Sequence, residues 1–177
     1  VLLDGASGHP RALIDGEALT LRRTAAASAL ASTYLARPDS AALLLIGTGA
    51  LAPHLARAPC ALRPIKKLML WGRNASRARA LAAQLREEGL PAEALADLAQ
   101  GLARADMVSC ATSATEPVVR GSQVRNGTHV DLVGGFTPQM READDELIVR
   151  AEIFVDTYAG ALAEAGDLVQ PLASGVL

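Results

Sequence analysis

A glycine-rich stretch of the chain has the residue types and the spacing of a phosphate-binding turn. It begins at Gly47 and reads Gly-Thr-Gly-Ala-Leu-Ala, which is the pattern G-x-G-x-x-A. Gly47 allows a tight turn, Gly49 lets the backbone approach a pyrophosphate without an intervening Cβ, and Ala52 lets a following helix pack closely on a strand. Together with Thr48 and Ala50, the turn presents backbone N–H groups at a helix start, where phosphates are attracted. This chemistry is typical of dinucleotide binding.

The segments on either side of the turn have the character needed to position it. The apolar run Ala42–Ile46 precedes the turn and is short and uniform enough for a strand buried on both faces. A helix is predicted over residues 53–61, and Pro53 in its first turn loses no N–H that the helix needs. A second apolar strand is predicted over residues 68–71. Strand, glycine turn, helix and strand form the context that makes the motif specific.

The end of the second strand indicates which dinucleotide is bound. NAD-binding turns usually have an Asp or Glu about 20 residues after the glycines, to hold the ribose 2′-hydroxyl. Here the chain continues Trp-Gly-Arg-Asn, with no carboxylate. Arg73 offers a planar fork to a ribose 2′-phosphate, and Asn74 and Ser76 add neutral donors. These residues favour NADP(H) and leave NAD(H) open. The alternative is that Arg73 only solvates the strand end while Asn74 or Ser76 caps the next helix.

Composition and charge argue against several classes of function. The chain has 177 residues, of which 50% are hydrophobic and 3% aromatic, so its core must be aliphatic and rich in alanine. A formal net charge of −2 gives no electrostatic case for binding nucleic acid or a membrane surface. Cys60 and Cys110 lack metal-ligand or redox spacing, and no His/Cys/carboxylate cluster indicates a metal. Without a secretion signal or a bilayer-spanning apolar run, the chain is interpreted as cytoplasmic.

The rest of the chain alternates between predicted helices and strands, after a hairpin over residues 1–16. The predicted elements are a helix from Thr20 to about Leu35, a helix over residues 76–88 that stops at Gly89, a strand within 91–96, a helix begun by Asp97, strands over 106–111, 128–133 and 153–156, and a helix over 158–165. This alternation predicts an α/β fold with a Rossmann-like, doubly wound parallel sheet and right-handed crossovers. The chain starts without Met and both of its ends resemble the middle of an element, so we expect an excerpt of a longer protein.

Several stretches together resemble the ornithine cyclodeaminase/mu-crystallin family. They occur in the family's order and cover nearly the whole chain, at residues 21–26, 46–50, 71–73, 105–112, 132–135, 140–142 and 164–167. The resemblance implies a Rossmann domain combined with a substrate and dimerisation domain built from both chain ends, and a homodimer. We therefore assign residues 1–40 to the substrate domain, 41–160 to the NADP-binding domain and 161–177 to the return into the substrate domain. The family's substrate-binding lysine is expected upstream of Val1.

The resemblance assigns a substrate-binding role to Arg23. This residue lies in an Arg-Thr-Ala-Ala stretch and matches the family's arginine that grips the substrate carboxylate. A bidentate guanidinium fixes a planar carboxylate and so orients the neighbouring C=N carbon. From the residues alone, an exposed helix arginine like its neighbour Arg22 is the simpler interpretation.

At Phe136 the sequence departs from part of the family. The cyclodeaminases and alanine dehydrogenases have an acid/base aspartate at this position, whereas the ketimine-reductase type lacks it and keeps Pro-x-x-Arg-Glu, here residues 138–142. Imine reduction depends less on an acid/base residue, because a protonated C=N is already electrophilic and needs mainly orientation and a hydride. Phe136 therefore favours a reductase. The phenyl ring can also be simple wall packing.

Other polar and small residues are weaker candidates. Thr112 and Ser113 follow the fourth strand and can contact the ribose or nicotinamide, or can bond their own backbone. Gly134 allows a close approach of the backbone to the nicotinamide. His129 is interpreted as a satisfied core histidine, and Asp167, in a Glu-x-Gly-Asp stretch, as a capping or structural residue.

The resulting hypothesis is NADPH-dependent reduction of a small cyclic imino acid. The substrate is Δ1-pyrroline-2-carboxylate or Δ1-piperideine-2-carboxylate, giving L-proline or L-pipecolate. The first alternative is an ornithine cyclodeaminase, which needs another acid/base group in place of the missing aspartate. An NAD-dependent alanine dehydrogenase and a non-catalytic NADP-binding protein are the further alternatives.

Overall fold

A parallel sheet forms the centre of the computed structural model, which describes residues 1–177. It has five strands in the order β5-β4-β3-β6-β7. The strands are β3 (Ala42–Ile46), β4 (Lys67–Trp71), β5 (Ala92–Ala94), β6 (Met107–Cys110) and β7 (His129–Leu132). The predicted doubly wound parallel sheet is confirmed. The chain moves outward from β3 in one direction through β4 and β5 and in the other through β6 and β7, so the switch point lies between the carboxyl ends of β3 and β6.

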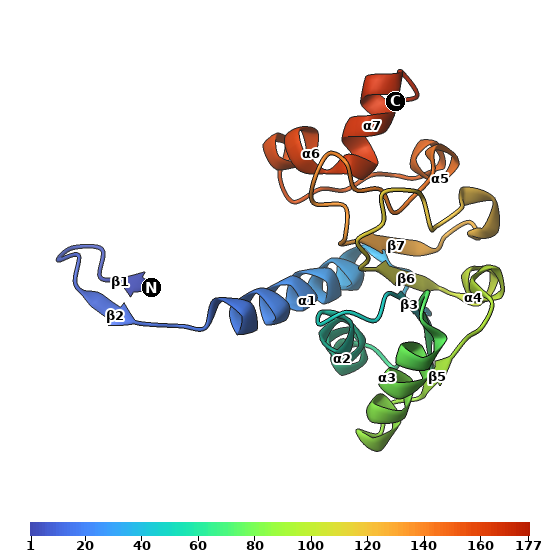
Figure 1. Ribbon diagram of the computed structural model, residues 1–177, viewed down its shortest axis with the longest axis horizontal. Coiled ribbons are helices and arrows are strands. Elements are labelled where there is room, and N and C mark those ends of the chain that lie inside the picture. Colours follow the sequence, from blue (N-terminus) through green and yellow to red (C-terminus); the bar gives the residue numbers. More distant parts are fainter.

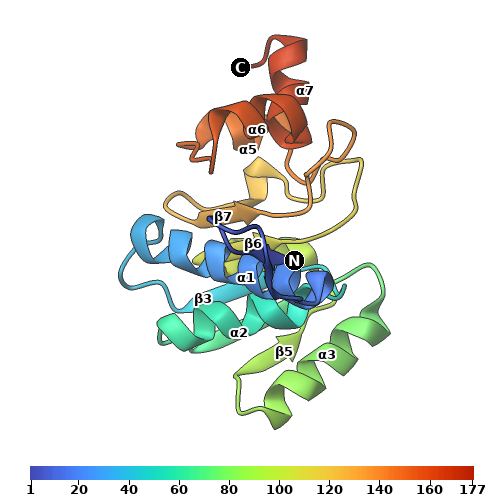
Figure 2. The same ribbon diagram turned by 90° about the vertical axis from the view of Figure 1, so that its left-hand side faces the viewer.

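Helices lie on both faces of the sheet and beyond its β7 end. They are α1 (Gly16–Leu35), α2 (Ala52–Leu62), α3 (Ala75–Glu87), α4 (Leu98–Arg104), the 3-10 helix η1 (Gly121–Gln123), α5 (Asp145–Arg150), α6 (Tyr158–Glu164) and α7 (Gly166–Ser174). Figure 2 shows α6 and α7 at one end of the molecule, beyond β7, and α3 at the other end beside β5.

The uniform apolar run of β3 supplies both halves of the core. Leu43 and Leu45 pack with residues of α1, α2 and α3, whereas Leu44 and Ile46 pack with residues of α4 and α5. Successive side chains of a strand point to opposite faces, so a strand covered on both sides must be apolar at every position. Figure 1 shows α2 and α4 on opposite sides of the sheet.

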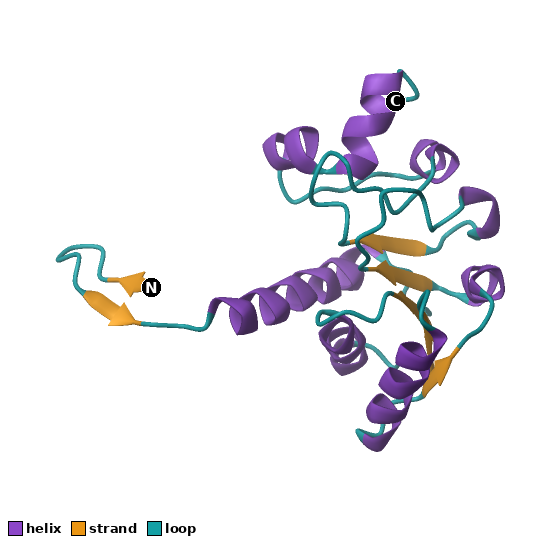
Figure 3. Cartoon of the chain, in the orientation of Figure 1, coloured by secondary structure: helices purple, strands orange, loops and turns teal.

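The amino-terminal segment projects away from the sheet. The predicted hairpin is confirmed as β1 (Leu2–Leu3) paired antiparallel with β2 (Pro10–Ala12), and Figures 1 and 3 show it beyond the free end of α1. The predicted start of α1 is wrong. The helix begins at Gly16, because the Asp15 carboxylate accepts the Ala18 N–H at 2.8 Å, and Thr20 lies inside the helix with its hydroxyl donating to the Gly16 carbonyl.

One predicted strand is absent. Residues 153–156 have no regular secondary structure, and Ile153, Phe154 and Val155 are exposed. The segment is as apolar as the true strands, but it pairs with no strand, and the outer edge of β7, which pairs only with β6, is left without a neighbouring strand. The other predicted strands and helices are confirmed with small shifts at their ends, including the stop of α3 before Gly89, whose φ is +84°.

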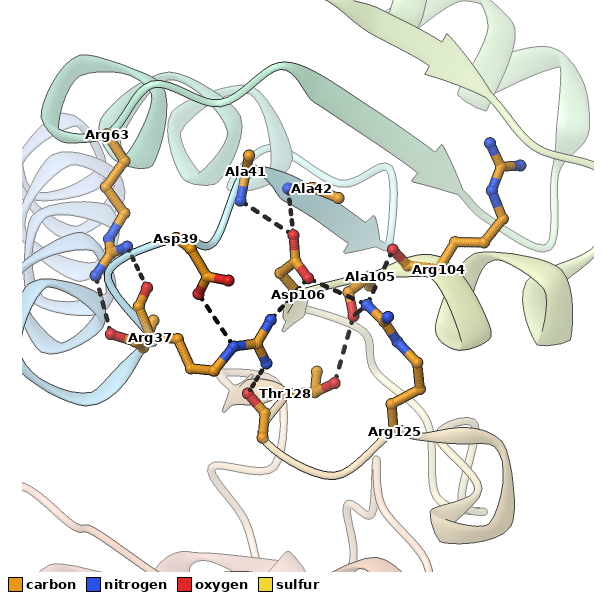
Figure 4. A network of polar contacts seen from close by, with 12 residues as sticks. Arg37, Asp39, Ala41, Ala42, Arg63, Arg104, Ala105, Asp106, Arg125 and Thr128 are labelled. Carbon is orange, nitrogen blue, oxygen red and sulfur yellow. Dashed lines mark hydrogen bonds and ion pairs between the residues drawn. The ribbon is translucent and has the colours of Figure 1, made fainter.

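An ion-pair network closes the amino end of the sheet (Figure 4). The Asp106 carboxylate accepts the backbone N–H groups of Ala41 and Ala42 at 3.1 and 3.0 Å. It also accepts from the guanidinium groups of Arg37 at 3.0 Å and Arg125 at 3.1 Å. Burial alone would raise the pKa of Asp106, but the N–H groups of Ala41 and Ala42 and the Arg37 guanidinium hold that pKa below its ordinary value. The network joins the starts of β3 and β6 to the segment before β7.

Candidate functional site

The predicted glycine turn lies at the carboxyl end of β3. Gly47 has a φ of +116°, a conformation that side chains rarely adopt, and a Cβ there would collide with the carbonyl oxygen of Ala111. Its N–H donates to the Trp71 carbonyl at 2.9 Å. The turn is therefore held between the ends of β4 and β6, and only glycine fits at its first position.

The turn presents unpaired backbone donors. Thr48, Gly49, Ala50 and Leu51 donate no backbone hydrogen bond within the chain. The following helix α2 has no side-chain cap, and Pro53 occupies its first turn. A Cβ built on Gly49 would meet nothing within 4 Å, so the space in front of the turn is open. Free N–H groups at the start of a helix attract anions, and the turn therefore fits a pyrophosphate.

The two residues predicted to meet a 2′-phosphate lie after β4. Both Arg73 and Asn74 are exposed. The Asn74 side chain caps α3, because its oxygen accepts the N–H groups of Ser76 and Arg77, each at 3.1 Å. The capping alternative is thus correct for Asn74, although its amide NH₂ group makes no hydrogen bond within the chain. Arg73 makes no hydrogen bond or ion pair, so its guanidinium is available to a ligand.

A buried carboxylate, Glu142, joins the loops that follow β6 and β7. Its Oε1 accepts from the Thr112 N–H at 2.6 Å and from the Thr112 hydroxyl at 2.7 Å, and its Oε2 accepts from the Gly134 N–H at 2.7 Å. Glu142 is fully buried. A Cβ on Gly134 would collide with the Thr112 carbonyl oxygen and with the Glu142 carboxylate. The Thr112 hydroxyl is therefore used inside the protein, and Gly134 is required by packing.

A second buried carboxylate, Asp167, supports the first. It lies in the first turn of α7, and its Oδ1 accepts the N–H groups of Glu142 and Ala143, each at 2.8 Å. Burial raises the pKa values of both Glu142 and Asp167, and their hydrogen-bond donors offset only part of that rise. The structural role predicted for Asp167 is confirmed.

Sequence reasoning gave Glu142 no role. The signal in the sequence that could have drawn attention to Glu142 was its place at the end of the Pro-x-x-Arg-Glu stretch. In the structure the next residue, Ala143, is fully buried. The partners of Glu142 could not be read from that stretch, because Thr112 lies 30 positions away along the chain.

The remaining candidates are not brought together with this cluster. Arg23 is exposed on α1 and makes no hydrogen bond or ion pair. Ser113 is also exposed. Phe136 is 65% exposed and does not pack in the core. No group of three or more His, Cys, Asp or Glu side chains could hold a metal ion.

His129 is not the satisfied core histidine that was predicted. Its ring is half-buried, and Nε2 is buried without a hydrogen-bond partner. It lines a small pocket under α1 together with Ser109 and Asp131, whose side chains bond each other at 3.0 Å. Burial lowers the pKa of His129. A strand residue that faces a helix finds no backbone partner, because its neighbours' N–H and C=O groups are used by the ladder.

Comparison with known proteins identifies relatives along the whole chain. The model of the ornithine cyclodeaminase/mu-crystallin family matches residues 1–175. A Δ1-pyrroline-2-carboxylate reductase of Paracoccus denitrificans is 42% identical over 180 residues, which are 100% of this chain and 56% of that protein. The chain thus spans about half the length of the curated relatives it matches.

Solved structures give the same picture. The Δ1-pyrroline-2-carboxylate reductase of Thermococcus litoralis, in complex with NADH and L-proline, superposes with a TM-score of 0.95 at 35% identity, covering 99% of this chain and 55% of that one. A probable ornithine cyclodeaminase of Bordetella pertussis also has 35% identity, with a TM-score of 0.88, over 95% of this chain and 54% of that one. No helix of the chain combines the length and apolar character that crossing a membrane requires.

Proposed function

The chain belongs to the ornithine cyclodeaminase/mu-crystallin family, and from this premise we propose that the full-length protein reduces a small cyclic imino acid with NADPH. The substrate is Δ1-pyrroline-2-carboxylate or its six-membered homologue Δ1-piperideine-2-carboxylate, and the product is L-proline or L-pipecolate. The names of the Paracoccus denitrificans and Thermococcus litoralis relatives support the reaction type.

The observation that carries the choice of a reductase is Phe136. By its resemblance to the family, the chain has Phe136 where the cyclodeaminase type has an acid/base aspartate, and the exposed ring brings no proton donor there. Glu142 and Asp167, the nearby buried carboxylates, do not substitute for that aspartate. Each already accepts backbone N–H groups and is almost fully shielded from solvent. A reaction that needs little proton transfer from the protein fits this site best.

The residues of the chain divide the work of binding and orientation. Thr48, Gly49 and Ala50 hold the pyrophosphate through their free backbone N–H groups, while Gly47 makes the tight turn that presents them. Arg73 binds the ribose 2′-phosphate. Arg23 grips the substrate carboxylate and so sets the direction in which the C=N carbon faces. When bound, the nicotinamide supplies the hydride. The structure of the Thermococcus litoralis relative contains NADH. The preference for NADPH proposed for this protein therefore rests on Arg73 alone.

Assembly and location complete the proposal. We assign residues 1–40 and 161–177 to a substrate and dimerisation domain, and residues 41–160 to the NADP-binding domain. The exposed hairpin and the free half of α1 are consistent with a surface that another part of the protein covers. The protein is proposed to be a homodimer in the cytoplasm.

The test is an activity measurement on the full-length protein. NADPH absorbance is followed with Δ1-pyrroline-2-carboxylate and with its six-membered homologue, and L-proline formation from L-ornithine is measured in parallel with NAD⁺. Rapid NADPH consumption without ornithine turnover is the expected result. L-Proline formed from ornithine would make the protein an ornithine cyclodeaminase, the activity named for the Bordetella pertussis relative. Tight NADPH binding without any turnover would indicate a non-catalytic binding protein.

A further inference from the structure

We propose that Glu142 is a positioning residue that fixes the spacing between the loops after β6 and β7, and that Asp167 sets Glu142 from α7. The inference deepens the proposed function and rests on it, because these two loops border the crevice at the carboxyl end of the sheet, where α/β folds bind their ligands.

The first step of the argument is the register of the two strands. Cys110 of β6 is paired with Leu132 of β7 at the end of the ladder. Thr112 and Gly134 each lie two residues further along their own strand directions. Their N–H groups are the first ones beyond the ladder bonds made by the two strands, and both donate to the same carboxylate. Glu142 therefore replaces the next step of the ladder and holds the two loops at a fixed separation.

The second step concerns charge. Glu142 has no ion pair, and its donors are two backbone N–H groups and one hydroxyl. A buried carboxylate without a cation costs free energy, but it can accept several strong, charge-assisted hydrogen bonds at once. A neutral amide has only one acceptor oxygen and cannot satisfy donors on both loops. The geometry thus requires a carboxylate.

The third step links this clamp to the carboxyl-terminal segment. The Asp167 Oδ1 atom accepts from two successive N–H groups, those of Glu142 and Ala143. Gly135 packs against the other Asp167 oxygen, where a Cβ would collide. Hydrogen bonds therefore run from α7 through Asp167 and Glu142 to both loops. Neither carboxylate accepts a hydrogen bond from the turn at residues 47–50.

Because the hydrogen bonds of Glu142 and Asp167 do not include the glycine turn, we expect a specific result for the full-length protein. Removing the clamp should displace the loops near the reacting end of the cofactor and leave the pyrophosphate and 2′-phosphate contacts in place. In Glu142→Gln, kcat for imino acid reduction should fall roughly 10- to 100-fold, because small displacements of reacting groups have effects of that size. The dissociation constant of 2′-phospho-ADP-ribose, which lacks the nicotinamide, should stay within about twofold of the wild-type value.

Two further variants complete the test. Glu146→Gln is the matched control, since Glu146 is an exposed residue four positions from Glu142 whose carboxylate pairs only with Arg150; kcat should not change. Asp167→Asn keeps Oδ1 as an acceptor for both N–H groups, so it should lower kcat far less than Glu142→Gln does. If Glu142→Gln does not fold, Glu142→Asp retains the charge but is one methylene too short to reach both loops, and the same loss of kcat is expected.

The outcomes separate the inference from the proposed function. Wild-type turnover of the imino acid decides the function, whereas the ratio of variant to wild-type kcat decides the role of Glu142. If the wild-type protein acts on ornithine instead, the same ratio is measured for that reaction. A Glu142 variant with lowered thermal stability but normal kcat would overturn the positioning role. Equal weakening of NADPH and 2′-phospho-ADP-ribose would also overturn it, because the effect would then extend to the glycine turn.

Discussion

The two ends of the same sheet differ in the partners of their buried carboxylates. At the amino end, the Asp106 carboxylate is paired with two arginines and two backbone N–H groups (Figure 4). At the carboxyl end, Glu142 is held by neutral donors alone, and the N–H groups of the adjacent glycine turn are left unpaired. The pKa of Asp106 is lowered and that of Glu142 is raised.

This difference in charge compensation indicates that the amino end of the sheet has a structural role and that the carboxyl end binds the ligand. A carboxylate with cations around it has its charge compensated by the protein, so nothing further is needed from a ligand. Unpaired N–H groups in an open space carry a free energy cost that a bound anion removes. Substitutions at the amino end should therefore change stability alone, whereas those at the carboxyl end should also change ligand binding.

The largest expected effect is that of Gly47→Ala. A side chain there meets the Ala111 carbonyl oxygen and a φ of +116°, so the free energy of unfolding should fall by about 3 kcal/mol or more. NADPH binding should be lost as well. Gly49→Ala is the control, because a Cβ at that position meets nothing within 4 Å. It should unfold like the wild type in thermal melts and yet bind NADPH more weakly in a titration.

A Gly49→Ala variant with normal NADPH affinity would contradict the role of this turn. Since the space in front of Gly49 is open in the protein itself, only a bound pyrophosphate would clash with the added methyl group.

The next effect in size concerns the amino end. Asp106→Asn removes the negative charge that Arg37 and Arg125 share, and the free energy of unfolding should fall by about 1–3 kcal/mol. The dissociation constant for NADPH should not change. Chemical denaturation and cofactor titration of the same preparation check both statements. A variant of normal stability that binds NADPH weakly would reverse the assignment of the two ends.

Much of the fold could be predicted because it depends on local patterns. The strands β3, β4 and β6 are mainly apolar runs bounded by loops, and the glycine turn has a spacing that its backbone conformation requires. Residues 153–156 have a similar local pattern and form no strand, because whether an apolar segment pairs with a free edge, such as the outer edge of β7, is not a local property. Tertiary relations decide such cases.

The candidate site was predictable only where the interacting residues lie within one short stretch of the sequence. The phosphate-binding turn is such a stretch, and so is the Asn74 cap of α3. Glu142 differs, because its carboxylate bonds Thr112 and Gly134 from two other segments. A sequence gives the residue type of such a carboxylate but not its partners, so the clamp became visible only with the structure.

A smaller effect sharpens the role of the residues beyond the turn. Arg73→Ala should weaken NADPH binding by roughly 10- to 100-fold, since charge-assisted hydrogen bonds to a phosphate contribute about 1.5–3 kcal/mol. NADH lacks the 2′-phosphate, so its affinity should hardly change. Arg77, which follows on α3, is also exposed and provides the control substitution Arg77→Ala. Equal losses for both cofactors in the Arg73 variant would remove the 2′-phosphate assignment.

The smallest effect tests the opposite pKa shifts directly. Asp106 has a native pKa below its ordinary value of 3.8, so its contribution to stability is present above pH 3.8 and is lost as the pH falls through the native pKa. Glu142 has a native pKa above its ordinary value of 4.5, so the folded state binds that proton more tightly than the unfolded state does. Its contribution is greatest below pH 4.5 and declines as the pH rises to the native pKa.

The two variants should therefore show pH dependences of opposite sign. The loss of stability caused by Asp106→Asn should grow as the pH rises through the native pKa to 3.8, whereas the loss caused by Glu142→Gln should be largest in acid and shrink toward neutral pH. Urea denaturation of the full-length variants and the wild type at matched pH values measures both differences. Slopes of the same sign would mean that the two ends of the sheet hold their carboxylates by the same kind of interaction. In that case the division into scaffold and site could no longer be argued from charge, and only the unpaired N–H groups of the glycine turn would support it.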